Sequence, residues 1–304
     1  MKMPSRKLTT TIPILASILA CSTMASGQGR QYPVRPGDDY RAVLKQLQPG
    51  DELVFLPGIH ERAAMLKLNG MADRPITLRG QAGPDGKRPV VQYSGKSNNL
   101  WRLEGQYVVI RDLELHATHE YALRVDRADY VHIENCTFRD CGAGCLSANT
   151  ADCHALHVRR CYFTGSRRAP VYIGRHDGGL KVTDFRFEGN VIDGRKIDAG
   201  VGYGIQLKLN VTGSFIRNNW IEQARGPGIM VYGATDDDPK LGNVVDGNVV
   251  VGSRTDAAIL VGAGPARVHG NLALGSPPGG IRVYDYNNWD MLRNIDVWNN
   301  TAAD

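Results

Sequence analysis

A short phrase that recurs through the last two thirds of the chain constrains the fold more than any other feature. It reads apolar-x-x-Asn-x-apolar, with cysteine in place of asparagine in the first two copies. Its Cys/Asn slots are Cys136, Cys161, Asn190, Asn219, Asn248, Asn271 and Asn300, so successive steps are 25, 29, 29, 29, 23 and 29 positions. Repeats of roughly 20–30 residues that consist of short strands indicate a β-solenoid.

Each repeat begins with an alternating strand. Alternation with period two directs one pair of apolar side chains inward and the residues between and after them outward. The inward pairs are Leu123/Val125, Leu146/Ala148, Val171/Ile173, Ile205/Leu207, Ile229/Val231, Ile259/Val261 and Ile281/Val283. The slot asparagines stack into a column in which each amide bonds its neighbours, and we therefore assign them a structural role.

Five cysteines follow Cys21, at positions 136, 141, 145, 153 and 161. Cys136 and Cys161 fill one slot in successive coils, about 4.8 Å apart by strand spacing, which is close enough for a disulfide. The alternative, which we favour, is a pair of small buried apolar side chains.

The N-terminus reads as an export signal over residues 1–25, with Lys2, Arg6 and Lys7 ahead of an apolar run at 12–20. Two interpretations of its end stay open: lipidation of Cys21 in a lipobox-like sequence, or cleavage after residues 25–27. Residues 26–36 form a polar lead-in, and 37–304 form one solenoid domain. The signal predicts a periplasmic protein, an outer-membrane lipoprotein or a secreted protein.

Both ends of the solenoid carry predictions. A helix N-capped by Asp38 or Asp39, with Tyr40, Val43, Leu44 and Leu47 on one face, would cap the first coil. The last coil stops just after Asn300, which predicts either a chain truncated after Asp304 or an end covered by a partner or a self-contact.

The net charge limits the partners. Three of the positive charges behind the total of +5 lie in the signal and no acid does, so the rest of the chain is near 5 − 3 = +2. This argues against nucleic-acid binding. We expect a monomer that contacts a membrane only through a lipid on Cys21.

The segments 47–60, 74–79 and 107–115 resemble the opening of the alginate lyase and chondroitinase B family, and the repeats resemble the pectin-lyase-like superfamily. The resemblance implies an all-β, right-handed parallel β-helix. In that family a Lys and an Arg act beside a Ca²⁺ ion held by acidic residues. Lys208 matches the Lys loosely, but Gly202 and Gly204 stand where the acidic pair is expected, and Tyr232 lies where the Arg is expected.

Outward positions in the middle coils carry the candidate site. Long connections at 190–205, 171–190 and 229–248 would wall a cleft around them. The candidate catalytic residues are Lys208, Tyr232, Arg175 and His176. The candidate substrate-binding residues are Tyr172, Gln206, Asn149, Tyr284 and Arg282.

These residues favour a lyase that cleaves an acidic, uronate-containing polysaccharide by β-elimination. Arg175 would bind the carboxylate, and either Lys208 or Tyr232 would remove the C5 proton, with His176 as a further base or acid. The alternatives are a glycan-binding surface β-helix without activity and a structural or adhesin-type solenoid. We predict no metal site. His132/His157 and residues 236–238 are weaker metal candidates, and Ca²⁺ stays open as a cofactor.

Overall fold

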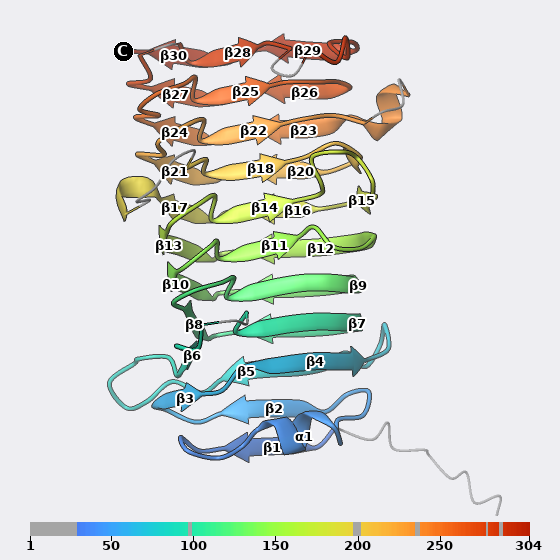
Figure 1. The fold of residues 1–304 in the computed structure, drawn as a ribbon, viewed down its shortest axis with the longest axis vertical. Coiled ribbons are helices and arrows are strands. Elements are labelled where there is room, and N and C mark those ends of the chain that lie inside the picture. The colour runs from blue at the N-terminus through green and yellow to red at the C-terminus, as the bar shows by residue number, and fades with distance from the viewer. Residues whose placement is uncertain (1–28, 97–98, 197–201, 235–237, 278, 286–287) are drawn as a thin grey trace, which may run out of the picture.

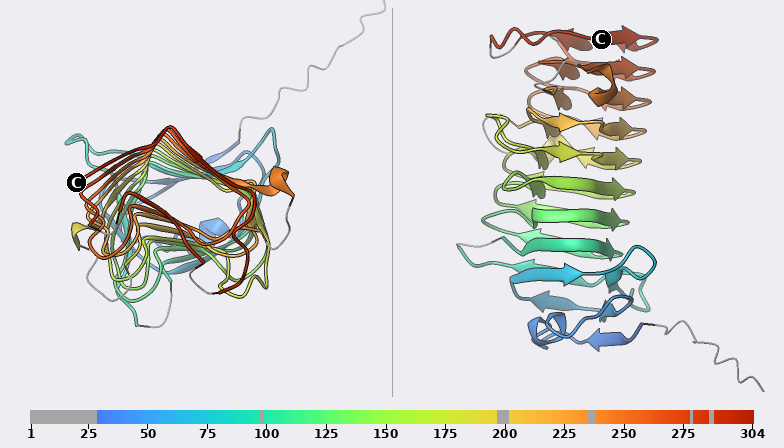
Figure 2. Two further views of the ribbon diagram at one scale, coloured as in Figure 1. Left: turned by 90° about the horizontal axis from the view of Figure 1, so that it is seen from above. Right: turned by 90° about the vertical axis from the view of Figure 1, so that its right-hand side faces the viewer.

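The computed structural model describes residues 29–304 except 97–98, 197–201, 235–237, 278 and 286–287. The described chain winds into a tall stack of parallel coils, about ten turns high, in which nearly all regular structure is strand (Figure 1). Seen along the stack, the coils superpose around one continuous interior (Figure 2). The helical elements in the described residues are α1 (Arg41–Leu44), η1 (Gly194–Lys196) and η2 (Pro239–Leu241).

Three faces of the stack are sheets. The first sheet contains β4 (Ala64–Asn69), the first halves of β7 (Trp101–Arg111) and β9 (Leu123–Glu134), β11 (Leu146–Ala148), β14 (Val171–Ile173), β18 (Ile205–Leu207), β22 (Ile229–Val231), β25 (Ile259–Val261) and β28 (Ile281–Val283). The second sheet contains β1 (Gln31–Val34), β2 (Glu52–Phe55), β5 (Ile76–Gly80), the second halves of β7 and β9, β12 (Cys153–Arg159), β15 (Val182–Thr183), β16 (Arg186–Glu188), β19 (Val211–Thr212), β20 (Phe215–Arg217), β23 (Asn243–Asp246), β26 (Ala266–His269) and β29 (Ile295–Trp298). The third sheet contains β3 (Ile59–Glu61), β6 (Val90–Tyr93), β8 (Glu114–Ala117), β10 (Thr137–Cys141), β13 (Tyr162–Ser166), β17 (Val191–Asp193), β21 (Trp220–Glu222), β24 (Val249–Val251), β27 (Leu272–Leu274) and β30 (Thr301–Ala303).

The core forms where the alternation predicts it. Equivalent inward residues pair in register from coil to coil, for example Val171 with Ile205 and Ile205 with Ile229. The inward pairs from β9 to β25 are fully buried, whereas Val283 of β28 is exposed at the C-terminal end of the stack. A fully buried Leu, Ile or Val contributes about 1.5–3 kcal/mol, so this repeated column is a main source of stability.

The asparagine column is confirmed. Side-chain amides donate upward from Asn190 to Asn219, Asn248, Asn271 and Asn300 in turn, with N–O distances of 2.8–3.2 Å. The column continues below through Cys161, whose backbone N–H donates to Asn190 at 2.8 Å. Cys136 and Cys161 are free and buried, like the other described cysteines, which agrees with the interpretation as small apolar residues.

The N-terminal end differs from the sequence-based expectation. The amphipathic helix is present only as one turn, Arg41–Leu44, and Tyr40 rather than an aspartate precedes it as the N-cap. The role of this segment as a cap stays a prediction. The solenoid also starts earlier, since β1 pairs with β2 from Gln31 onward, inside the predicted lead-in.

The predicted export signal, including Cys21, lies outside the described residues. Within the described part of the chain, no helix is long and apolar enough to cross a membrane.

Candidate functional site

Lys208 follows β18 on the outward side of the first sheet. Its position depends on Gly174 of the preceding coil, which has a φ of +84°. A side chain on Gly174 would place its Cβ 2.5 Å from Cγ2 of Val211 and 3.2 Å from Cβ of Lys208. Glycine is therefore required there both for the backbone conformation and for the close approach of the two coils.

The ammonium group of Lys208 lies between two tyrosine rings. Its Nζ is 5.4 Å from the ring centroid of Tyr172 and 4.8 Å from that of Tyr232. The residue is only 7% exposed. Within the described residues its ammonium group makes no hydrogen bond or ion pair, so the two ring faces are the polar environment of that group.

Burial lowers the pKa of Lys208 from 10.5 to about 8. Removing the ammonium group from water disfavours its charged form, and no carboxylate among the described residues compensates. A lysine with a pKa near 8 has a substantial neutral fraction in mildly alkaline solution. Such an amine can accept a proton, as a general base must.

The two tyrosines differ in accessibility. Tyr232 is 2% exposed, and its ring packs over Gly262 and against Trp289, with ring centroids 5.1 Å apart. Tyr172 is half-buried. Burial first, and then the negative charge of Asp177, raise the pKa of Tyr172, so its phenol keeps its proton. Of these two rings, Tyr172 is therefore the one that a ligand can contact.

The connection after β14 lies beside Lys208. Arg175 and His176 are exposed, and the guanidinium of Arg175 pairs with Asp177 at 2.5 Å. The side-chain amide of Asn210 donates to the carbonyl of Gly178 at 2.6 Å and so joins this connection to the next coil. His176 packs on Trp289, with ring centroids 5.5 Å apart.

Polar groups without partners lie on the N-terminal side of Tyr172. The first sheet pairs Tyr172 with Ser147 and with Gln206, so all three share one outward column. Within the described residues, Ser147 Oγ and Asn149 Oδ1 are buried and make no hydrogen bond. An unpaired buried polar atom costs free energy, so these two atoms lower the stability of the fold at this position.

The same column continues through a charged cluster. Asp126 accepts hydrogen bonds from Arg102 and Arg124, both at 2.6 Å, and from Thr150 at 2.8 Å. Burial alone would raise the pKa of Asp126, but the bonds from Arg124, Thr150 and Arg102 lower it overall. Two arginines to one aspartate leave a net positive charge.

On the C-terminal side the column is apolar and covered. Met230 and Leu260 point outward by register but are buried in an apolar cluster with Tyr232, against which Trp289 and Met291 pack. Arg282 and Tyr284 lie beyond this cluster, in the last coil. The guanidinium carbon of Arg282 is 4.3 Å from the Tyr284 ring centroid. The structure thus brings Lys208, Tyr172, Tyr232 and Gln206 together and leaves Arg282 and Tyr284 apart from them.

Comparisons with known proteins identify the fold. Residues 93–187 match a family model described as a right handed beta helix region. Among solved structures, an alginate lyase from Paenibacillus sp. str. FPU-7 aligns with a TM-score of 0.61 and 16% identity over 90% of this chain and 99% of that one. A PL6 family alginate lyase aligns with a TM-score of 0.52 and 18% identity over 83% of this chain and 40% of that one. A pectin methylesterase from Aspergillus niger aligns with a TM-score of 0.51 and 10% identity over 88% of this chain and 91% of that one. A comparison with curated proteins finds no match.

The chain is a right-handed parallel β-helix. At these identities the likeness concerns the fold alone, and the fold serves more than one reaction, because lyases and an esterase share it. Function must therefore be argued from the side chains of this β-helix.

Trp289 is the site residue that the sequence analysis missed. It lies between β28 and β29, in a coil that spans 19 positions from Ile281 to Asn300, as do the coils from 171 to 190 and from 229 to 248. The length of this connection was therefore a usable signal. Which coil a connection folds over is a matter of long-range packing, and the spacing does not specify it.

The weaker candidates gain no support as metal sites. His132 and His157 lie in contact on the second sheet, and His157 Nε2 is 3.3 Å from Asp184. The described residues contain no group of three metal-ligating side chains. Asp238 accepts a hydrogen bond from the backbone N–H of Lys240 at the start of η2, and positions 236 and 237 lie outside the described residues.

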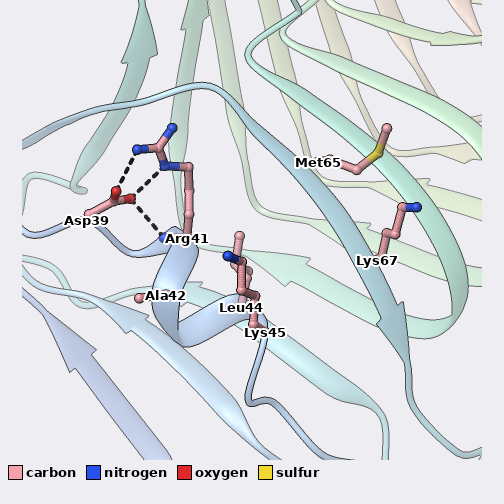
Figure 3. Close-up of a pocket in the computed structure, with 7 residues that line it drawn as sticks. All are labelled: Asp39, Arg41, Ala42, Leu44, Lys45, Met65 and Lys67. Carbon is pink, nitrogen blue, oxygen red and sulfur yellow. Dashed lines mark hydrogen bonds and ion pairs between the residues drawn. The ribbon is translucent and has the colours of Figure 1, made fainter.

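A separate cavity of about 500 Å³ lies at the N-terminal end of the β-helix, between α1 and β4 (Figure 3). Its lining includes Lys45, Met65, Lys67 and Arg41, and Arg41 is hydrogen-bonded to Asp39. Met65 pairs in register with Arg102, so this cavity adjoins the outward column that contains Tyr172.

Proposed function

We propose that this β-helix is an exported lyase that cleaves a uronate-containing polysaccharide by β-elimination, with Lys208 as the base. The observation that carries the proposal is the buried amine of Lys208, with a pKa lowered to about 8, beside the half-buried phenol of Tyr172. The similarity to solved alginate lyases supports it at the level of the fold.

The chemistry needs three groups. The neutral amine of Lys208 removes the proton from C5, next to the sugar carboxylate. The electron pair of that C–H bond forms the C4–C5 double bond, and the C4–O4 bond breaks. Tyr172 donates its phenolic proton to the departing O4, and a proton transfer from Lys208 to Tyr172 restores both groups.

Negative charge develops on the uronate during proton removal, so a cation must meet its carboxylate. Arg175 is the nearest exposed arginine on the connection that follows β14. Its pairing with Asp177 fixes one side of its guanidinium fork and leaves other N–H groups for the ligand. Gln206 and the half-buried Asn149 would bond the sugar hydroxyls.

The decisive assay follows the ultraviolet absorbance of the new double bond on alginate, polygalacturonate, glucuronan and chondroitin, with and without Ca²⁺. We expect turnover on at least one substrate that Lys208→Ala abolishes. Lys181→Ala, which removes an exposed lysine next to the same connection, is the matched control and should retain full activity. Loss of activity in both variants, or in neither, would argue against Lys208 as the base.

A glycan-binding β-helix without activity is the second candidate. It is favoured by the half-buried ring of Tyr172 and the partly exposed Arg124 in the same outward column, which could hold an acidic sugar without any reaction. Retention of folded wild type on a glycan, with no absorbance change on any substrate, would select this candidate.

Export is part of the proposal and rests on residues 1–25 alone. Fractionation of cells that express wild type and Cys21→Ser would separate the two interpretations. A lipoprotein would move from the membrane fraction to the soluble fraction in the variant, whereas a protein cleaved after residues 25–27 would be soluble in both.

A further inference from the structure

The outward face of the first sheet is closed on one side of Lys208. In an open sheet the outward residues of β22 and β25 would be exposed, yet Met230 and Leu260 are fully buried. Both belong to an apolar cluster with Tyr232, Tyr203 and Leu209, and Trp289 and Met291, from the connection between β28 and β29, pack against this cluster. The backbone N–H of Trp289 donates to Asp285 Oδ1 at 2.8 Å, which fixes the connection against itself.

The closure extends across the sheet beside the site. His176 packs against Trp289 from the connection after β14, and Tyr232 packs against it from β22. A glycan that passes Lys208 in the C-terminal direction would have to displace these rings. Such displacement would expose apolar surface to water, which is unfavourable.

The opposite direction is polar. From Tyr172 the outward column continues to Ser147, Arg124 and Arg102, one residue per coil. Ser147 is fully buried, so the partly exposed members of this column are Tyr172, Arg124 and Arg102. Arg124 lies three strands from Gln206 of the Lys208 strand, about 14 Å at the usual strand spacing. The Arg102 side chain is 41% exposed, and Asp126 holds both arginines in place.

We propose that the cleft is one-sided. It binds an acidic glycan by one end at the Lys208 coil, and the rest of the chain runs over β14, β11 and β9. Arg102 and Arg124 bind the carboxylate of a sugar further along. The inference rests on the proposed function for the place of the reacting sugar, and it implies removal of short products from a chain end rather than cleavage at internal bonds.

The mode of cleavage is read by comparing solution viscosity with ultraviolet absorbance during one digestion. A one-sided cleft predicts that absorbance rises while viscosity falls slowly, with unsaturated products of one to a few sugars from the earliest times. An early collapse of viscosity with long fragments would overturn the inference and leave the proposed function intact.

The proposed path of the glycan toward the N-terminal coils is tested with Arg124→Gln, which removes the charge and keeps a polar side chain. The matched control is Arg267→Gln, at an exposed position on the second sheet. Arg124→Gln should raise KM for the polymer about tenfold, as expected for the loss of one charge-assisted hydrogen bond, and should change KM for the shortest substrate little. An equal change in KM for the polymer in the two variants would contradict binding of the glycan over the N-terminal coils.

The same pair of variants separates this inference from the proposed function. In an alginate-containing native gel, with Lys208→Ala in every protein to prevent turnover, Arg124→Gln should be retarded less than the Arg267→Gln control. This holds even if wild type shows no lyase activity. Equal retardation of the two variants would show that Arg124 does not bind the glycan.

Discussion

Lys208 is a residue whose burial costs stability and supplies reactivity. Its pKa is lowered from 10.5 to about 8, so the folded chain binds this proton more weakly than the unfolded chain does. Between these pH values the unfolded state holds more protons, and wild-type stability therefore rises with pH across that window. Below pH 8 the buried ammonium group is charged, and its full destabilising effect on the folded state is present.

Lys208→Met should therefore stabilise the protein at pH 7. The gain in free energy of unfolding should be on the order of 2–3 kcal/mol and should shrink as pH rises from 8 toward 10.5. Denaturant unfolding at several pH values measures it. A destabilised variant at pH 7 would mean that the ammonium group has a stabilising partner.

The lyase activity should also follow the titration of Lys208, because loss of its proton produces the active base. Because the base must be neutral, kcat/KM should rise about tenfold per pH unit below pH 8 and level off above it. The raised pKa of Tyr172 keeps the acid protonated over this range. A rate independent of pH between 6 and 8 would assign the proton transfer to another group.

Tyr172 and Tyr232 should respond differently to removal of the hydroxyl. Tyr172→Phe should lower kcat by roughly 10²-fold or more, the usual worth of a general acid, with little change in KM. Tyr232→Phe keeps the buried ring that packs on Trp289 and should retain most of the activity. The reverse order in steady-state kinetics would make Tyr232 the acid despite its burial.

At the scale of elements, the asparagine column holds the corner between the second and third sheets. Asn219 accepts from the Asn190 amide at 3.2 Å and donates to Phe187 and Asn248, both at 2.8 Å. Asn219→Ala leaves several buried groups unpaired and should lower the free energy of unfolding by on the order of 3 kcal/mol.

The exposed Asn69 of β4 supplies the control, and Asn69→Ala should change stability little. Thermal unfolding measures both variants. Because the column lies away from the first sheet, kcat of folded Asn219→Ala should stay near that of wild type. A large loss of activity without loss of stability would contradict a purely structural role.

The strands and the asparagine column were predictable because short-range sequence patterns specify them. Period-two alternation placed Ile205 and Leu207 inward, and the repeated slot placed Asn219 in its column. The burial of outward residues was not predictable in this way, because Met230 and Leu260 belong to a cluster that packs against Trp289 and Met291, more than 20 positions further along the chain. The apolar pattern at Tyr40, Val43, Leu44 and Leu47 predicted a longer helix than the single turn Arg41–Leu44 that the structure shows.

At the scale of the whole molecule, each coil contacts mainly its neighbours, so local damage should stay local. Tyr40 tests this near the N-terminal end. It is fully buried, its hydroxyl donates to the carbonyl of Arg62, and Trp101 Nε1 donates to it at 2.9 Å. Tyr40→Phe leaves that indole N–H unpaired and should cost about 1–3 kcal/mol.

Hydrogen exchange should then show faster opening of β1 to β5 in Tyr40→Phe, with β14 to β22 unaffected, and kcat should stay that of wild type. Tyr130→Phe, at an exposed tyrosine, is the control and should change neither. Uniformly faster exchange in all coils would show that the β-helix unfolds as one cooperative unit.

The central claim is that the amine of Lys208 performs an elimination on a uronate chain. The most direct measurement is the ultraviolet absorbance assay with wild type, Lys208→Ala and Lys181→Ala on the four polysaccharides. The account predicts a new double bond on at least one of them with wild type and Lys181→Ala and none with Lys208→Ala. Folded wild type that produces no double bond on any of the four, or Lys208→Ala that remains as active as wild type, would contradict it.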